Sequence, residues 1–92
     1  MFIGSLVKLK PDTQRINEAE KRFVNNAIQE DWIWLVTSID SEGIDFWIQP
    51  LYLEDSMIVL GAELLVLFDE IEEVNIAGEE LFDELRKQQY DC

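Results

Sequence analysis

The chain has 92 residues, 48% of them hydrophobic, and its 20 acidic and 7 basic side chains give a formal net charge of −13. This length predicts a single domain over residues 1–92, and three Trp with five Phe are too many aromatic residues for a disordered acidic tail. The negative charge argues against direct binding to nucleic acid or to an anionic membrane, since phosphates are bound by clustered Lys and Arg.

The first elements expected along the chain are a strand and a long helix. Residues 5–10 are expected to form a strand because Val7 and Leu9 alternate with Lys8 and Lys10, and Pro11 ends it because proline cannot donate to a strand ladder. Residues 12–30 have helical periodicity, and either Asp12 or Thr13 can cap the N-terminus of the helix. The apolar stripe of this helix consists of Ile16, Ala19, Phe23, Val24, Ala27 and Ile28.

A β-hairpin is expected next. Residues 32–40 are apolar on both faces, which is typical of a central strand that is covered on both sides. A turn at 41–43 leads into residues 44–49, which alternate with Trp47 on the polar side, and Pro50 ends the strand. In the first strand, one face carries Ile33, Leu35 and Ile39, and the other carries Trp32, Trp34 and Val36.

The rest of the chain is expected to form a connection, further strands and a helix. Residues 51–56 form the connection, and residues 57–60 form an apolar strand. Residues 62–74 fit both a helix and a buried strand, and we interpret them as a short helical turn followed by a strand through about Phe68. Residues 77–89 form the last helix, with acids near its start and bases near its end.

The N-terminal segment resembles a known fold family. The sequence Gly-Ser-Leu-Val-Lys-Leu-Lys-Pro at residues 4–11 resembles the first strand of small SH3-like barrels in bacterial proteins. The strand at residues 34–36, the turn at Gly43 and residues 57–67 continue the pattern, so the resemblance covers about residues 3–68. We therefore expect an α+β fold with a small, mainly antiparallel sheet of four or five strands in an SH3-like arrangement. A helix after the first strand and a C-terminal helix are additions to that pattern.

The acidic side chains are distributed unevenly along the chain. Residues 23–85 contain sixteen acids and no Lys or Arg, and residues 69–84 contain eight of those acids. Glu79 with Asp83, and Glu80 with Glu84, are like-charge pairs at i,i+4, each of which costs a helix a few tenths of a kcal/mol. Solubility alone does not require such crowding, which points to a surface that binds a basic partner.

The acids of this segment are the predicted protein-binding residues, with Trp47 as an apolar anchor. One helical turn separates carboxylates by about 5–6 Å, a density comparable to the 3.4 Å rise per phosphate of a DNA strand. By charge and size the chain resembles phage-encoded inhibitors of host defence, such as anti-CRISPR and anti-restriction proteins that mimic nucleic acid. The predicted residues are Asp69, Glu70, Glu72, Glu73, Glu79, Glu80, Asp83, Glu84 and Trp47.

Two functions compete at this point. The first is a non-enzymatic inhibitor that occupies a basic, nucleic-acid-binding site on a target protein. The alternative is an SH3-like structural or adaptor subunit of a larger complex, in which the acids only provide solubility. The basic side chains before residue 23 are expected to pair with the chain's own acids, although they could also pair with a second copy in a homodimer. These are Lys8, Lys10, Arg15, Lys21 and Arg22.

The residues that usually carry catalysis are missing from the chain. It has no His and no glycine-rich phosphate loop, and its one Cys, Cys92, cannot form an intrachain disulfide. We therefore expect no enzymatic activity, no cofactor and no metal, and an incidental thiol at Cys92. The N-terminus has no basic start before an apolar run, and no apolar run is long enough for a bilayer, so a cytoplasmic location is expected.

Overall fold

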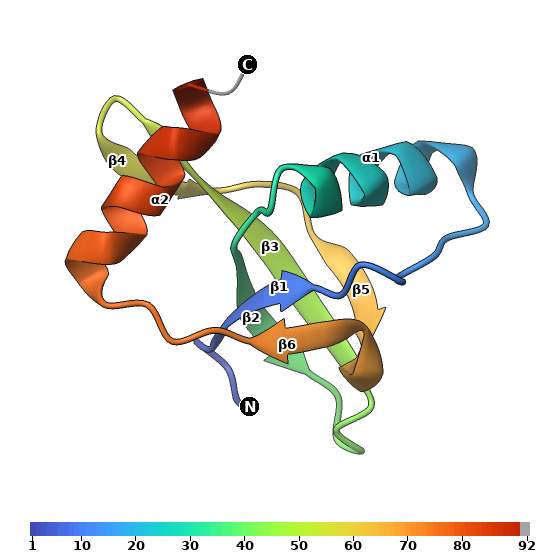
Figure 1. Ribbon diagram of the computed structural model, residues 1–92. Helices are drawn as coiled ribbons and strands as arrows, with labels where there is room; N and C mark the ends of the chain where they lie inside the picture. The colour runs from blue at the N-terminus through green and yellow to red at the C-terminus, as the bar shows by residue number, and fades with distance from the viewer. Residues whose placement is uncertain (91–92) are drawn as a thin grey trace.

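The computed structural model describes residues 1–90, so the predicted incidental thiol of Cys92 lies outside the described residues. The chain forms an α+β domain with a mainly antiparallel sheet and two helices, which confirms the predicted fold class (Figure 1). The elements are β1 (Leu6–Leu9), α1 (Glu18–Gln29), β2 (Trp34–Ile39), β3 (Asp45–Glu54), β4 (Met57–Leu60), β5 (Leu64–Leu67), the 3-10 helix η1 (Phe68–Glu70), β6 (Ile71–Glu73) and α2 (Gly78–Tyr90).

The sheet is antiparallel, as predicted. The sheet runs β4-β3-β2-β1-β6, every pairing is antiparallel, and β5 also pairs with β3. β4 and β5 lie along successive parts of β3, because Leu60 is opposite Leu51 and Leu64 is opposite Ile48. η1 then returns the chain to β1, where β6 pairs. The sheet therefore has six strands rather than four or five.

β3 continues through Pro50, so the prediction that this proline ends the strand and that residues 51–56 form a connection was wrong. Backbone groups at and next to the proline hydrogen-bond to neighbouring parts of the chain: Leu51 N donates to Ile33 O at 2.9 Å, and Gly61 N donates to Pro50 O at 2.8 Å. A Cβ at Gly61 would lie 2.8 Å from Pro50 Cγ, so only glycine lets the proline ring pack this closely.

The alternation of β3 reverses at Pro50, and this divides the interior into two cores. Phe46 and Ile48 belong to the first core, whereas Leu51 and Leu53 belong to the second. The first core includes α1, and the second includes α2, so each helix covers a different part of the sheet (Figure 1). The first core contains Val7, Leu9, Val24, Ala27, Trp34, Val36, Phe46, Ile48, Leu64, Val66 and Ile71, and the second contains Ile33, Leu51, Leu53 and Leu85.

β2 is apolar on both faces, as predicted, but one residue lies on the other face. Trp34 and Val36 are buried in the first core, and Leu35 packs against the second. Ile39 was expected on the face of Leu35, yet it packs against the first core. The register shifts between Val36 and Ser38, and this β-bulge reverses the alternation beyond it.

α1 begins later than predicted. Its N-cap is Asn17, whose side chain accepts hydrogen bonds from Ala19 N and Glu20 N at 2.9 and 3.3 Å, so the predicted caps Asp12 and Thr13 were wrong. The preceding segment instead packs against η1, where the buried Thr13 donates to Glu70 O at 3.1 Å. Ile16, expected in the apolar stripe, therefore lies outside the helix and is fully exposed.

The ambiguous segment 62–74 is mainly extended. β5 confirms the predicted strand, but the helical turn follows it as η1 instead of preceding it, and β6 was not predicted. Leu64 and Val66 are buried while Leu65 and Leu67 are exposed, which is strand periodicity. The predicted C-terminal helix is confirmed as α2, with acids in its first turn and Lys87 in its last.

Candidate functional site

The structure distributes the nine predicted residues over four elements. Asp69 and Glu70 lie on η1, and Trp47 lies on β3. The other six form two groups, with Glu72 and Glu73 on β6 and Glu79, Glu80, Asp83 and Glu84 on α2. The eight acids therefore do not form one continuous array, because Glu70 faces the protein itself.

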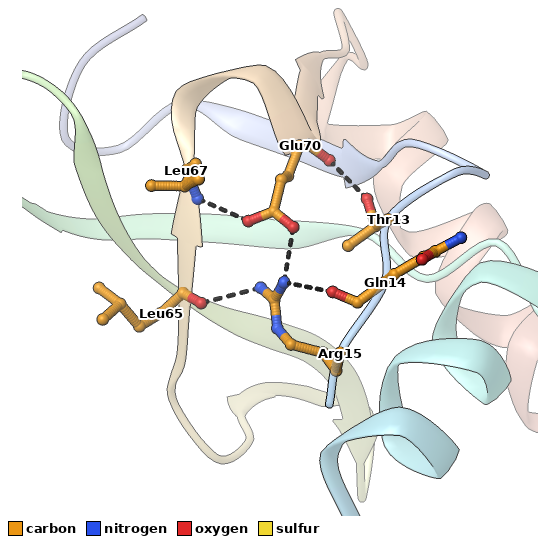
Figure 2. Close-up of polar contacts among 6 residues, drawn as sticks. All are labelled: Thr13, Gln14, Arg15, Leu65, Leu67 and Glu70. Atoms are coloured by element: carbon orange, nitrogen blue, oxygen red, sulfur yellow. Dashed lines mark hydrogen bonds and ion pairs between the residues drawn. The ribbon is translucent and has the colours of Figure 1, made fainter. Parts of the chain in front are cut away.

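Glu70 is an internal ion-pair partner. Its Oε2 accepts from Arg15 Nη1 at 2.5 Å, and its Oε1 accepts from Leu67 N at 2.8 Å (Figure 2). The Arg15 and Glu70 side chains are only 14% and 17% exposed. A carboxylate with both oxygens occupied in this way serves the fold, so Glu70 does not belong to a partner-binding surface.

Arg15 joins the loop before α1 to the edge strand of the sheet. Its Nη2 donates to Leu65 O on β5 at 2.9 Å, and its Nη1 also donates to Gln14 O at 3.0 Å (Figure 2). The prediction that basic side chains pair with the chain's own acids is confirmed for Arg15 and for Lys8, whose Nζ lies 2.7 Å from Asp31 Oδ2.

The acids of β6 and α2 remain at the surface. Glu72 and Glu73 are exposed, opposite Lys8 and Val7 of β1. On α2, Leu85 is fully buried and Leu81 and Phe82 pack against the second core, so the acids lie on the rest of the helix surface. Glu79 and Glu80 are exposed. Asp83 lies 3.5 Å from Arg86, and Glu84 lies 3.5 Å from Lys87.

A shallow groove lies between α2 and Lys8 of β1, and residues 74–76, which connect β6 to α2, also line it. Its volume is about 570 Å³, and the charged side chains that line it are Lys8, Asp31, Glu80, Asp83, Glu84 and Lys87. Four acids thus face two lysines, and the groove is negative but not uniformly so. Of the four acids, Asp31, Glu80 and Asp83 are exposed and Glu84 is half-buried.

Trp47 is set apart from the acids of β6 and α2. Its side chain is 40% exposed, as the alternation of the hairpin predicted, and its register partners are Ser38 on β2 and Leu65 on β5. Leu65 and Leu67 are also half exposed, and sequence reasoning missed both. Once residues 64–67 are assigned as a strand, their alternation with a period of two predicts that Leu65 and Leu67 face solvent.

Comparison with known proteins gives no assignment. No protein-family model matches the chain, and no curated protein or solved structure matches it either. None of the helices within residues 1–90 combines the length and apolar character needed to cross a membrane.

Proposed function

We propose that the chain is a non-enzymatic, cytoplasmic inhibitor that occupies a basic, nucleic-acid-binding site on a target protein. The contact is made by an acidic surface, defined as Glu72 and Glu73 on β6 together with Glu79, Glu80 and Asp83 on α2. Glu70 is omitted from this surface because it pairs with Arg15.

The observation that supports the proposal is that most of these carboxylates have no ion pair within the fold. All five are exposed, and among the described residues only Asp83 has an ion pair, at 3.5 Å to Arg86. The like-charge spacing of Glu79 and Asp83 costs the helix a few tenths of a kcal/mol. A crowded acidic surface with so few internal ion pairs is accounted for by a partner that supplies the opposite charge.

The proposal is tested with two variants of equal net charge. In the surface variant, Glu72, Glu73, Glu79 and Glu80 are changed to Gln. In the control variant, the exposed residues Glu20, Glu42, Glu54 and Glu63 are changed to Gln. Each has a net charge of −13 + 4 = −9.

The partner is captured from bacterial lysate on the immobilised wild-type chain, and each variant is then titrated against the purified partner. Four exposed ion pairs at about 0.5 kcal/mol each amount to about 2 kcal/mol, so the surface variant binds roughly 30-fold more weakly. The control variant changes by less than about threefold. Double-stranded DNA or RNA competes with the chain for the partner.

Salt gives a second readout. A contact made by charged groups weakens as the Debye length falls from about 30 Å at 0.01 M to about 3 Å at 1 M salt. An adaptor contact through apolar side chains would change little. Equal losses in the two variants, or affinity that is indifferent to salt, would refute the proposal.

A further inference from the structure

A second surface of the molecule is apolar and lies at the end of the β3–β5 ladder. We name it the end patch, and it consists of Ile44, Trp47, Leu65, Leu67 and Phe68, each between 40% and 56% exposed. The register places Trp47 opposite Leu65, and Phe68 N donates to Ile44 O at 3.1 Å. Trp47, Leu65 and Leu67 lie on the outer face of the ladder. Ile44, directly before β3, and Phe68, on η1, lie at its end, next to Leu67.

The end patch is hollowed rather than flat. Ile44, Leu67 and Phe68 line a shallow hollow of about 340 Å³ together with Gly43 and Asp69. Phe68 makes a ring contact with the buried Phe46, at 6.0 Å between centroids, and α2 covers the other half of β3. Apolar patches of this kind on a small domain commonly mark a protein contact.

The charges around the end patch are mostly negative. Asp45 lies on β3 opposite Leu67, Asp69 borders the hollow, and Glu42 lies in the adjoining turn. The nearby cation is Arg15, which borders the same strands but is held by Glu70. A second copy of the chain would bring another net charge of −13 and another acidic rim against this one.

We infer that the end patch binds a segment of a partner protein that presents apolar side chains flanked by Lys or Arg. The apolar side chains fill the hollow beside Leu67 and Phe68. The basic side chains lie toward Asp45 and Asp69, where they find carboxylates without a described ion pair. This surface is distinct from the acidic surface of β6 and α2 and does not depend on the proposed function.

The experiment titrates the full ¹⁵N-labelled chain with an amphipathic Leu/Lys peptide, and with the matched Leu/Glu peptide as a charge control. We expect the largest amide shifts at residues 43–47 and 65–69 with the Leu/Lys peptide only. The double variant Leu65→Ser/Leu67→Ser lowers affinity by about tenfold or more. Its matched control, Met57→Ser/Leu60→Ser, removes two exposed apolar side chains from β4 and changes affinity by less than about threefold.

Two further double variants distinguish the effect of charge at the end patch from the effect of charge elsewhere on the molecule. Asp45→Asn/Asp69→Asn weakens binding by about three- to fivefold, whereas Glu79→Gln/Glu80→Gln, on α2, leaves it unchanged. Amide dispersion of each variant checks that the fold survives. Absence of binding at peptide concentrations on the order of 1 mM would overturn the inference. So would loss of binding confined to the α2 variant, or concentration-dependent self-association in sedimentation that Leu65→Ser/Leu67→Ser abolishes.

Discussion

The role of each charged residue depends on which groups lie near it in space. Glu70 and Glu72 are two positions apart, yet Glu70 binds Arg15 and Leu67 N while Glu72 is exposed. Arg15 and Glu70 are separated by 55 positions, so no local pattern could have linked them. The exposure of Trp47 was predictable because it follows from alternation along its own strand.

The Arg15–Glu70 pair should be worth more than the other ion pairs. Its side chains are largely covered, so Arg15→Met should lower the free energy of unfolding by about 2 kcal/mol, between typical values for surface and buried pairs. Glu70→Gln should cost about 1 kcal/mol, because the amide oxygen still accepts from Leu67 N. Urea unfolding followed by Trp fluorescence measures both changes.

The control for this prediction is Arg86→Met. Arg86 lies 3.5 Å from Asp83, and their side chains are 60% and 69% exposed. Its loss should cost roughly 0–0.5 kcal/mol. If Arg15→Met lowered the free energy of unfolding no more than Arg86→Met, a structural role for the Arg15–Glu70 pair would be contradicted.

At the scale of the elements, local patterns predicted strands and helices well and their boundaries less well. The hairpin of β2 and β3 and the helix α2 follow from periodicity within their own segments. The prediction that the strand ends at Pro50 was wrong because the place of Pro50 in β3 depends on Gly61, which leaves room for the proline ring. The start of α1 was also misplaced, because Thr13 has a distant partner on η1.

The corrected start of α1 can be tested directly. Asn17→Ala should lower stability by about 1 kcal/mol, because Ala19 N and Glu20 N lose their acceptor. Asn17→Asp should retain most of it, because a carboxylate also accepts and interacts favourably with the helix N-terminus. Thermal unfolding followed by circular dichroism measures the difference.

Asp12→Ala is the matched control for the cap. Asp12 is exposed and lies before the loop that leads to the helix, so its loss should change stability by less than about 0.5 kcal/mol. If Asp12→Ala lowered stability more than Asn17→Ala, Asn17 would not be the N-cap, and the sequence-based prediction of Asp12 would be correct.

For the whole molecule, composition gave the amount of charge but not its arrangement. The acid-rich segment 69–84 runs through η1, β6 and α2, and these elements turn its carboxylates in different directions. Three of the chain's five N-terminal basic residues come before α1 and the other two lie in its first turns, and two of the five form ion pairs with Asp31 and Glu70. The binding surfaces therefore had to be found from the fold.

The cost of the charge should be shared by the whole molecule even if its function is local. The radius of gyration is 12.8 Å, shorter than the Debye length of about 30 Å at 0.01 M salt, so every acid repels every other. Two unit charges about 20 Å apart in water repel by roughly 0.2 kcal/mol, and each Gln removes many such terms. Part of this repulsion persists in the unfolded chain.

Both four-residue Gln variants should therefore be more stable than the wild type at 0.01 M NaCl, by at least about 1 kcal/mol or about 4–8 °C in Tm. The surface variant changes two acids in a helix first turn, Glu79 and Glu80, and the control changes one, Glu20. Because such charges favour the helix dipole, the surface variant should gain slightly less than the control. At 1 M NaCl the three proteins should converge, because the Debye length of about 3 Å is then shorter than the spacing between helical neighbours. A wild-type Tm that does not rise with salt would show that the charge has no cost, and a gain confined to the surface variant would show that the repulsion is local. If the two variants gain similar stability but lose binding to different extents, the acids of β6 and α2 differ from the other acids in their contact with the partner.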